Sequence, residues 1–310
     1  MKQTIFTLLF LSVTGLISCR KTTIQPTIKQ YDQTQIQNYM AAHGISSTQM
    51  IRDTVGGDTT GLYYQILQPP TSTTPLQYWD KVSFVFTIRT FDGTYVQSDT
   101  IANHYDDFVG HIVTGKLPFG LQLAIHNNLK YPGGSMRLLI PSHLAYGVNG
   151  YGSGSTQVAN SRIPGNASLD YYVHVIDNQP AYDDLVIKNY MLANSLSGYS
   201  KTADGLYYKI LTPATGTAVI NDNTTVTYTD TGQLFNGTLF DYASNGTNTG
   251  VHDVIDFVPG VREGLENYAK TGTKISLLLP SALGYGGIPN GAIPPNSCLR
   301  FTFQIVSITP

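Results

Sequence analysis

Two stretches of the chain alternate between apolar and polar residues with the period of two that indicates a half-buried strand. The first covers residues 81–87 (Lys-Val-Ser-Phe-Val-Phe-Thr), and the second covers residues 224–228 (Thr-Thr-Val-Thr-Tyr). A turn signal follows each one, Asp-Gly at residues 92–93 and Asn-Gly at residues 236–237. Short alternating segments with such turns predict an antiparallel β-sheet in each half of the chain.

Helical spacing is confined to short segments. Val261, Leu265 and Tyr268 are spaced i, i+4 and i+7 behind Pro-Gly at residues 259–260, which predicts one short helix in the second half. Residues 120–125 hold the same place in the first half. The pattern therefore predicts an α+β unit, built twice, in which an antiparallel sheet wraps over one short helix.

A further short helix is expected before each sheet, over residues 31–40 and residues 182–196. Asp183 and Asp184 are typical of a helix start, because carboxylates are favoured near a helix N-terminus. Pro180 is expected to break the chain just before the second of these helices.

The chain also repeats itself. Residues 61–67 (Gly-Leu-Tyr-Tyr-Gln-Ile-Leu) return at residues 205–211 with one change, and residues 140–147 return in similar form at residues 279–286. The offset of about 145 residues is far longer than solenoid repeats of about 20 to 50 residues. It indicates a duplicated domain, so differences between the two copies become evidence about function.

We predict four segments from these boundaries. Residues 1–18 form a signal peptide, residues 19–30 a tether, residues 31–180 the first domain and residues 181–310 the second domain. A chain of 310 residues is long enough for two domains of ordinary size.

The first residues resemble a bacterial lipoprotein signal. Lys2 supplies a positive charge, residues 5–17 are apolar but too short to span a membrane, and Leu-Ile-Ser-Cys at residues 16–19 is similar to a lipobox. The resemblance implies cleavage before Cys19 and lipidation of that residue, which would anchor the protein to a membrane. The predicted location is the bacterial envelope, at the outer membrane and facing the periplasm or the surface. The alternative is an ordinary signal peptide that ends near a cysteine.

Composition agrees with a protein outside the cytoplasm and excludes some functions. Charged residues make up 12% of the chain, against about 25% in an average domain. The net charge of −2 carries no nucleic-acid footprint. Cys298 lies in an apolar segment and is expected to be a buried thiol without a disulfide partner. The seven histidines show no metal-ligand spacing, so no metal and no cofactor are expected.

The second half resembles the FKBP-type peptidyl-prolyl cis-trans isomerases in six blocks that follow the family's order over about residues 203–309. Each block alone is weak, but six in order are a specific signal. The blocks are the strand ending in Tyr228, Leu239-Phe240-Asp241, Phe257-Val258-Pro259-Gly260, residues 272–280, Leu283-Gly284-Tyr285-Gly286, and Ala292-Ile293-Pro294-Pro295 leading to the strand with Phe301.

The resemblance implies a proline pocket and three catalytic residues. Tyr285 would give its hydroxyl to a substrate carbonyl, and Asp241 would place a carboxylate beside the amide, tied to the Tyr228 hydroxyl. The family usually has a Trp on the pocket floor, and Val261 stands there in this chain. That loss of ring area predicts weaker binding of substrate. The substrate-binding walls would be Tyr228, Phe240, Val258, Val261, Ile293 and Phe301, with Phe257 at the rim.

The chemistry fits such walls. An X–Pro amide rotates over a barrier of about 18–20 kcal/mol, and no nucleophile or cofactor is needed. The planar amide is more polar than the twisted one, because resonance places charge on its oxygen. An apolar pocket therefore penalises the planar state more than the twisted state, which lowers the barrier.

The first half keeps the same frame over about residues 59–178 with altered chemistry. Phe86 is expected where Tyr228 stands, which removes a hydroxyl, and Val96-Gln97 is expected where Phe240-Asp241 stands, which removes a ring and a carboxylate. Leu121 falls near the position of Val261, while Tyr146, Ile163 and Tyr171 keep the positions of Tyr285, Ile293 and Phe301. We expect a retained fold with isomerase activity reduced or absent. The contrary interpretation is that the remaining apolar walls still form a working pocket.

The sequence thus predicts a membrane-anchored, two-domain prolyl isomerase that acts on proline-containing polypeptides of the envelope and assists their folding. One alternative is a chaperone or binding lipoprotein whose pockets grip proline-containing segments without useful turnover. Another is a scaffold lipoprotein in an envelope complex. The sequence carries no prediction of the oligomeric state.

Overall fold

The computed structural model describes residues 26–310, except for residues 56, 58 and 242–248. The predicted signal peptide, Cys19 and most of the tether lie outside the described residues. Among the residues that are described, none of the helices has the length and the apolar composition needed to cross a membrane.

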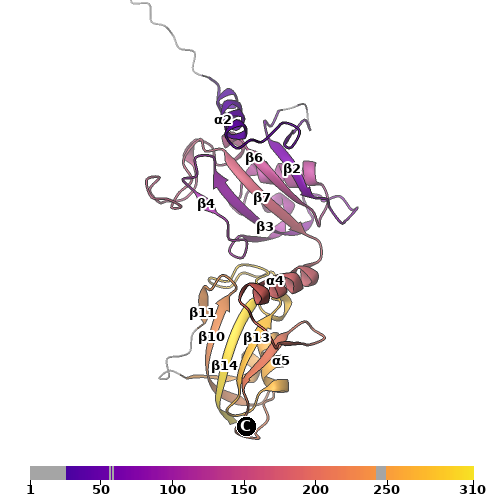
Figure 1. Cartoon of the computed structure of the whole chain (residues 1–310), viewed down its shortest axis with the longest axis vertical. Helices are drawn as coiled ribbons and strands as arrows, with labels where there is room; N and C mark the ends of the chain where they lie inside the picture. The colour runs from indigo at the N-terminus through magenta and orange to yellow at the C-terminus, as the bar shows by residue number, and fades with distance from the viewer. Residues whose placement is uncertain (1–25, 56, 58, 242–248) are drawn as a thin grey trace, which may run out of the picture.

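Two antiparallel sheets of seven strands dominate the structure (Figure 1). The first sheet has the order β1-β2-β6-β7-β3-β4, with β5 paired to β3. All its neighbours are antiparallel, as the alternating pattern predicts. Its strands are β1 (Ile51–Arg52), β2 (Tyr63–Gln68), β3 (Lys81–Thr90), β4 (Val96–Gln97), β5 (His104–Phe108), β6 (Ser135–Ile140) and β7 (Leu169–Ile176).

The second sheet repeats this topology strand for strand. Read from its other edge, the order is β8-β9-β13-β14-β10-β11, with β12 paired to β10. The internal repeat in the sequence is therefore a repeat of the whole fold. The strands are β8 (Ser200–Lys201), β9 (Tyr207–Thr212), β10 (Thr225–Leu234), β11 (Leu239–Asp241), β12 (Gly250–Asp253), β13 (Lys274–Leu279) and β14 (Leu299–Thr309).

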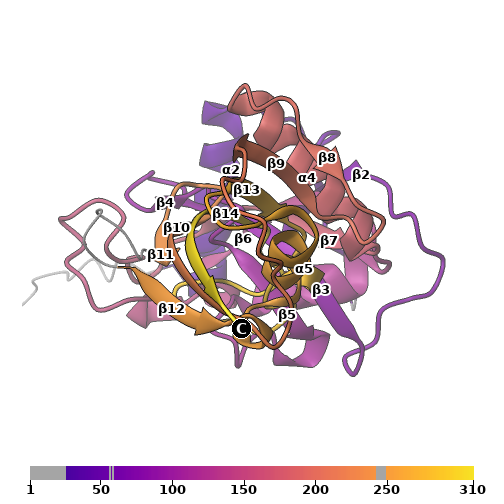
Figure 2. The same ribbon diagram turned by 90° about the horizontal axis from the view of Figure 1, so that it is seen from below.

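One short helix packs against each sheet. α3 (Phe119–Ala124) continues into a single π-helical turn, Ile125–Leu129, and α5 (Pro259–Tyr268) occupies the same place in the second sheet. Seen along the long axis, α5 lies within the curve of β9, β13, β14 and β10 (Figure 2). Buried apolar side chains of each helix and sheet form one core per unit, which confirms the α+β class predicted from the sequence. Short 3₁₀ turns complete the units at Val109–His111, Ser142–Leu144, Gly147–Asn149, Val254–Asp256 and Ser281–Leu283.

A longer helix precedes each sheet, and a buried aspartate fastens it. In α2 (Ile28–Ala42), Asp32 accepts a hydrogen bond from the Ser142 hydroxyl at 2.6 Å. In α4 (Gln179–Ala193), Asp183 accepts hydrogen bonds from both the amide and the hydroxyl of Ser281 at 2.8 and 2.6 Å. We call α2 with the first sheet the first unit, and α4 with the second sheet the second unit.

The prediction for Pro180 was wrong. Pro180 lies inside the first turn of α4, which begins at Gln179. A proline is tolerated there because the first helical amides have no partner within the helix. The predicted domain boundary near residue 180 thus falls at the start of α4.

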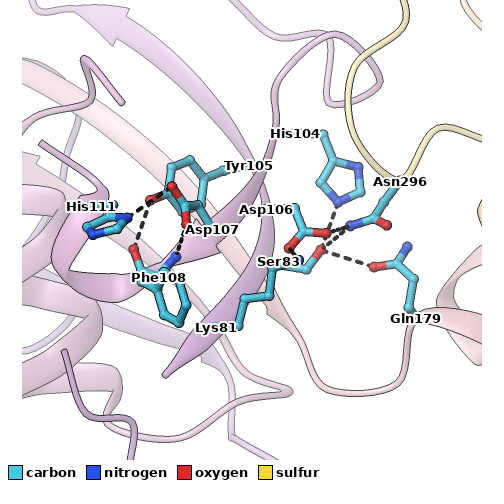
Figure 3. A network of polar contacts seen from close by, with 10 residues as sticks. All are labelled: Lys81, Ser83, His104, Tyr105, Asp106, Asp107, Phe108, His111, Gln179 and Asn296. Carbon is cyan, nitrogen blue, oxygen red and sulfur yellow. Dashed lines mark hydrogen bonds and ion pairs between the residues drawn. The ribbon is translucent and has the colours of Figure 1, made fainter. Parts of the chain in front are cut away.

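α4 lies between the two sheets (Figure 1), where the units contact each other. At this junction the Ser83 hydroxyl of β3 donates to the Gln179 side chain at 3.0 Å and is hydrogen-bonded to His104 Nε2 at 2.9 Å (Figure 3). The Asn296 side-chain amide, from the far end of the second unit's chain, donates to Asp106 Oδ2 at 2.8 Å and to Ser83 at 3.2 Å (Figure 3). The contact between the units is therefore a specific polar network.

Candidate active site

The structure brings the predicted pocket residues of the second unit together. They belong to one apolar cluster that also includes the inner face of the second sheet. Four of them are buried, namely Tyr228, Val261, Ile293 and Phe301. Four more are partly buried and pack against these, namely Phe240, Phe257, Val258 and Tyr285.

Different elements supply these side chains. β10, β11 and β14 bring in Tyr228, Phe240 and Phe301, and α5 with the residue before it brings in Val261 and Val258. The Phe240 ring meets the Phe301 ring edge-on with centroids 5.5 Å apart, a favourable geometry for aromatic pairs.

Two glycines leave room for the rings. A Cβ at Gly232 of β10 would lie 2.7 Å from the Phe240 ring and 2.8 Å from the Phe301 ring. A Cβ at Gly250 of β12 would lie 2.7 Å from the Tyr228 ring. Both positions therefore need glycine if the aromatic side chains are to keep these places.

Tyr228 has a different hydrogen-bond partner from the one expected. Its hydroxyl is hydrogen-bonded to Nδ1 of His252 at 2.9 Å, and the structure shows no direct bond to Asp241. Strand pairing explains this, because β12 runs beside β10 and carries His252 next to Tyr228. Burial raises the pKa of the Tyr228 phenol, and the charges of Asp230 and Asp241 raise it further.

Asp241 lies at the exposed end of β11, within electrostatic reach of both tyrosines. Burial raises the pKa of Tyr285, the charge of Asp241 adds to this effect, and the Asn290 side chain opposes it. Both hydroxyls therefore keep their protons at neutral pH and are able to donate hydrogen bonds. This arrangement matches a site that orients a substrate amide rather than one that attacks it.

The loop after β13 carries Tyr285 and Ile293. Gly286 has a φ of 58°, in the left-handed region that favours glycine, and its amide donates to the Ser281 carbonyl at 2.9 Å. Ile293 exchanges two backbone hydrogen bonds with Asn290, at 2.9 and 3.0 Å. These bonds hold both side chains against Tyr228, Phe240, Phe257 and Phe301, which we call the aromatic cluster.

Two contributors were missed from the sequence. In the sequence His252 is only one of seven histidines without metal-ligand spacing, and its contact with Tyr228 depends on the pairing of β12 with β10. Phe303 is buried and packs its ring 5.2 Å from Tyr228 and 5.7 Å from Phe257. The period of two along β14 could have identified Phe303, because it lies two residues after Phe301 and so on the same face.

In the first unit, strand register corrects one prediction. Phe84 pairs with Val175, and two residues later Phe86 pairs with Val173. In the second unit Tyr228 pairs with Ile305, at the place in the ladder that corresponds to Phe84. Phe84 is therefore the counterpart of Tyr228, and the prediction of Phe86 was wrong by one step along the same face. The hydroxyl is absent in either case.

The same register shows that the first unit has large side chains at the two positions where the second unit has Gly232 and Gly250. Ile88 stands at the position of Gly232, since each pairs with the second aromatic counterpart, Tyr171 or Phe301. Tyr105 stands opposite Phe84 as Gly250 stands opposite Tyr228. Ile88 and Tyr105 are both buried, and the Tyr105 ring stacks on Phe84 with centroids 4.7 Å apart.

In the first unit, the tyrosine that corresponds to Tyr285 already uses its hydroxyl in a hydrogen bond. The Tyr146 hydroxyl donates to the Lys116 carbonyl at 3.3 Å, and its ring stacks on Tyr151 at 4.8 Å. Tyr151 lies in a Gly-rich segment and is bridged to Ile163. The first unit therefore lacks the two glycines that make room for aromatic rings in the second unit, and its Tyr146 hydroxyl already donates to a backbone carbonyl.

Elsewhere in the described part of the chain, no group of three or more His, Cys, Asp or Glu side chains is placed to hold a metal ion. Cys298 is a buried free thiol, as predicted. A cavity of about 390 Å³ lies at the junction, lined by Val85 and Ile101 of the first unit and by Val186 and Tyr190 of α4. None of the pocket residues named above lines this cavity.

Comparison with known proteins shows which family the second unit resembles. Residues 216–306 match the sequence model of the FKBP-type peptidyl-prolyl cis-trans isomerase family. The chain is 36% identical over 115 residues to the FKBP-type peptidyl-prolyl cis-trans isomerase FkpA of Buchnera aphidicola, a match that covers 37% of this chain and 45% of that protein. It is 28% identical over 243 residues to human peptidyl-prolyl cis-trans isomerase FKBP9, covering 77% of this chain and 36% of that protein.

Among solved structures, the chain aligns with FkpA from Escherichia coli at 30% identity and a TM-score of 0.38, over 42% of this chain and 61% of that one. The three FKBP domains of wheat FKBP73 align at 20% identity and a TM-score of 0.33, over 80% of this chain and 95% of that one. The matched part of this chain spans less than half of each curated relative, 45% of the Buchnera protein and 36% of the human protein.

Proposed function

We propose that this chain, which belongs through residues 216–306 to the FKBP-type peptidyl-prolyl cis-trans isomerase family, accelerates the cis/trans exchange of X–Pro bonds in polypeptides. The observation that carries the proposal is the aromatic cluster of the second unit, in which eight predicted pocket residues meet. The second domain, residues 181–310, would be the catalytic one.

The walls would do most of the work. Desolvation by the pocket raises the energy of the polar planar amide more than that of the twisted amide, so the barrier falls without covalent chemistry. Phe240, Phe301 and Ile293 would hold the proline ring, with Val261 beneath it. Because Val261 offers less surface than an aromatic floor, substrate binding would rely more on the two phenylalanine rings.

Polar groups would orient the peptide. Tyr285 carries its proton at neutral pH, as a tyrosine with an ordinary pKa of about 10 already does, and burial and Asp241 raise that pKa further, so it would donate to a substrate carbonyl. Asp241 is exposed at the rim and would place its carboxylate beside the amide. Tyr228 would act in concert with His252, to which its hydroxyl is bonded.

The first domain, residues 31–180, would be catalytically inactive. Its altered pocket positions support this view over a second working site, because Ile88 and Tyr105 stand where two glycines make room for aromatic rings in the second unit. The lipobox-like segment ending at Cys19 supports anchoring to a bacterial envelope membrane, with secreted or envelope chains as substrates.

The test is cis/trans exchange of a Leu-Pro peptide, measured with the full chain lacking its signal segment. Tyr285→Phe should lower kcat/KM by about 5- to 20-fold, since one hydrogen bond to the substrate is lost. Tyr146→Phe, the same change at the equivalent place in the first unit, is the matched control and should leave the rate unchanged. A folded wild-type chain without any acceleration would refute the proposal.

The alternative of a binding protein is favoured by one observation, the Val261 floor, which reduces the surface available to a bound proline. In that case the chain would suppress aggregation of a proline-containing client while exchange stays at its uncatalysed rate. Measuring both quantities on one preparation separates the two functions.

A further inference from the structure

The loop that carries Tyr285 and Ile293 rests on the first unit. Its two ends are tied together by a hydrogen bond of 2.7 Å from the Asn296 amide to the Gly286 carbonyl. From there the Asn296 side chain crosses to the first unit, where it donates to Asp106 Oδ2 at 2.8 Å (Figure 3). One residue therefore connects the pocket loop both to itself and to the neighbouring unit.

The first unit approaches the pocket loop so closely at Gly287 that no side chain fits there. A Cβ at this position would lie 2.1 Å from Asp106 Oδ2, although its backbone φ lies outside the left-handed region. Glycine is thus needed here because of the first unit and not because of backbone conformation. The Asp106 side chain is only 10% exposed and is also paired with Lys81 at 3.1 Å, so it has little freedom to move aside.

The duplication supplies an internal comparison. In the first unit the Asn166 amide donates to the Gly147 carbonyl at 2.8 Å, as Asn296 does to Gly286, so the two loops have the same closure. The residue after Gly147 is Val148, whose side chain is 73% exposed. Where no neighbouring unit covers this loop, a large side chain stands in the place of Gly287.

A second contact supports the other side of the pocket. The Asn236 side-chain amide donates to Asp99 Oδ2 of the first unit at 2.6 Å. Ile101 packs against the cluster that contains Phe235 and also against the apolar core of the second unit. The turn at Asn236 leads directly into β11, which carries Phe240 and Asp241.

We propose that Asp106 is a positioning residue for the isomerase pocket, and that the first unit serves as a fixed support for the loop from Gly284 to Ser297. This inference rests on the proposed function of the second unit. Asp106 would act through Asn296 and Gly287 on the placement of Tyr285 and does not itself touch substrate. The first unit would thus contribute to catalysis although its own pocket is filled.

The Asp106 carboxylate is found in the first unit and has no counterpart in the second unit. Strand pairing places Asp106 opposite Ser83 in β5 and β3, and Val251 opposite Thr227 at the equivalent place in β12 and β10. Val251 is 58% exposed and offers no hydrogen-bond acceptor in its side chain. The second unit therefore cannot support a further copy in the same way.

The experiment compares full-length variants in the exchange assay, with separate determination of kcat and KM. Gly287→Ala and Asp106→Ala should each lower kcat/KM by about 3- to 10-fold, because small displacements of orienting groups are costly. Asp106→Asn keeps an acceptor for Asn296 and should stay within about twofold of wild type. Val148→Ala is the matched control for the loop in the first unit and should change nothing.

The double variant Gly287→Ala with Asp106→Ala provides the decisive comparison. Its kcat/KM should be no lower than that of Asp106→Ala alone, since the added methyl group no longer meets a carboxylate. Amide hydrogen exchange of residues 284–297 should increase in Asp106→Ala and remain at the wild-type level in Asp106→Asn.

Additive losses in the double variant would overturn the inference, and so would unchanged kcat/KM in Asp106→Ala with faster exchange of the loop. Both results leave the proposed function intact as long as the wild-type chain is active. A wild-type chain without activity would instead refute the proposed function.

Discussion

Protonation of His104 is expected to destabilise the folded chain in mild acid. The ring lies at the junction between the units, hydrogen-bonded to Ser83, and burial lowers its pKa from 6.5 to about 4, although Asp106 acts in the opposite direction. The unfolded chain therefore takes up this proton first as the pH falls. The stabilisation is complete above about pH 6.5 and is lost progressively down to about pH 4.

The size of the effect follows from that interval. At about 1.4 kcal/mol for each pH unit, the interval corresponds to at most about 3.5 kcal/mol, and partial exposure of the ring reduces this to about 1 to 2 kcal/mol. Other groups face the same region, namely Asp106 and Lys81 from the first unit and Asp183 from α4. His174 also has a pKa lowered by burial, so it contributes to the acid response of every variant.

The assay is urea denaturation of wild type, His104→Gln and His111→Gln at pH 7.5 and at pH 5. Glutamine at residue 104 keeps a partner for Ser83 but does not titrate, so His104→Gln should lose about 1 to 2 kcal/mol less than wild type between the two pH values. His111→Gln is the same substitution at an exposed histidine that is paired with Asp107. Equal losses in wild type and His104→Gln would refute the reasoning.

Two further predictions concern the pocket. Gly232→Ala should lower kcat/KM by more than about tenfold, because the new methyl group would meet two aromatic rings at less than 3 Å; the Leu-Pro exchange assay measures this, and an unchanged rate would mean that the rings are not the walls. His252→Ala should lower kcat/KM by about 2- to 5-fold by removing the partner of the Tyr228 hydroxyl, and combining it with Tyr228→Phe should cause no further loss; additive losses would show that the two residues act separately.

The aromatic cluster could be predicted from the sequence because it depends on local order. Tyr228, Phe240 and Phe301 lie on strands whose period and turns are visible in the chain, and their family resemblance fixes which face is the inner one. The helices before each sheet were recognisable for the same reason. Such features depend on residues close together in sequence, where spacing carries the information.

The corrections at Phe86 and Tyr228 have one physical origin, which is strand register, whereas the correction at Pro180 concerns the start of a helix. A period of two identifies a face but not which residue on that face stands opposite a given partner, so Phe86 and Phe84 fit the pattern equally well. The Tyr228 to His252 bond likewise depends on how β12 pairs with β10. Neither result can be read from alternation alone.

The junction lay further beyond reach, because Asn296 and Asp106 are separated by 190 residues. No local pattern joins them, yet a comparison of the two repeats indicates that such a contact exists. Gly287 differs from Val148 at equivalent places in the two copies, and a glycine without a positive φ indicates a close approach by some other group. Comparing duplicated loops for such exchanges is a way to locate contacts between domains.

Divergence between the two units follows from where each one is covered. The second unit keeps Gly232, so the Phe240 and Phe301 rings pack closely over β10, and its loop is supported from behind through Gly287. The first unit carries Ile88 at the place of Gly232 and gains stability by filling its own core. Its outer strand carries Asp106, which the second unit lacks, and this side chain acts on the other pocket. Loss of one site and support of the other are therefore compatible within one fold, because they involve opposite faces of β3 and β5. Ile88 and Tyr105 lie on the inner face, and Asp106 lies on the outer face.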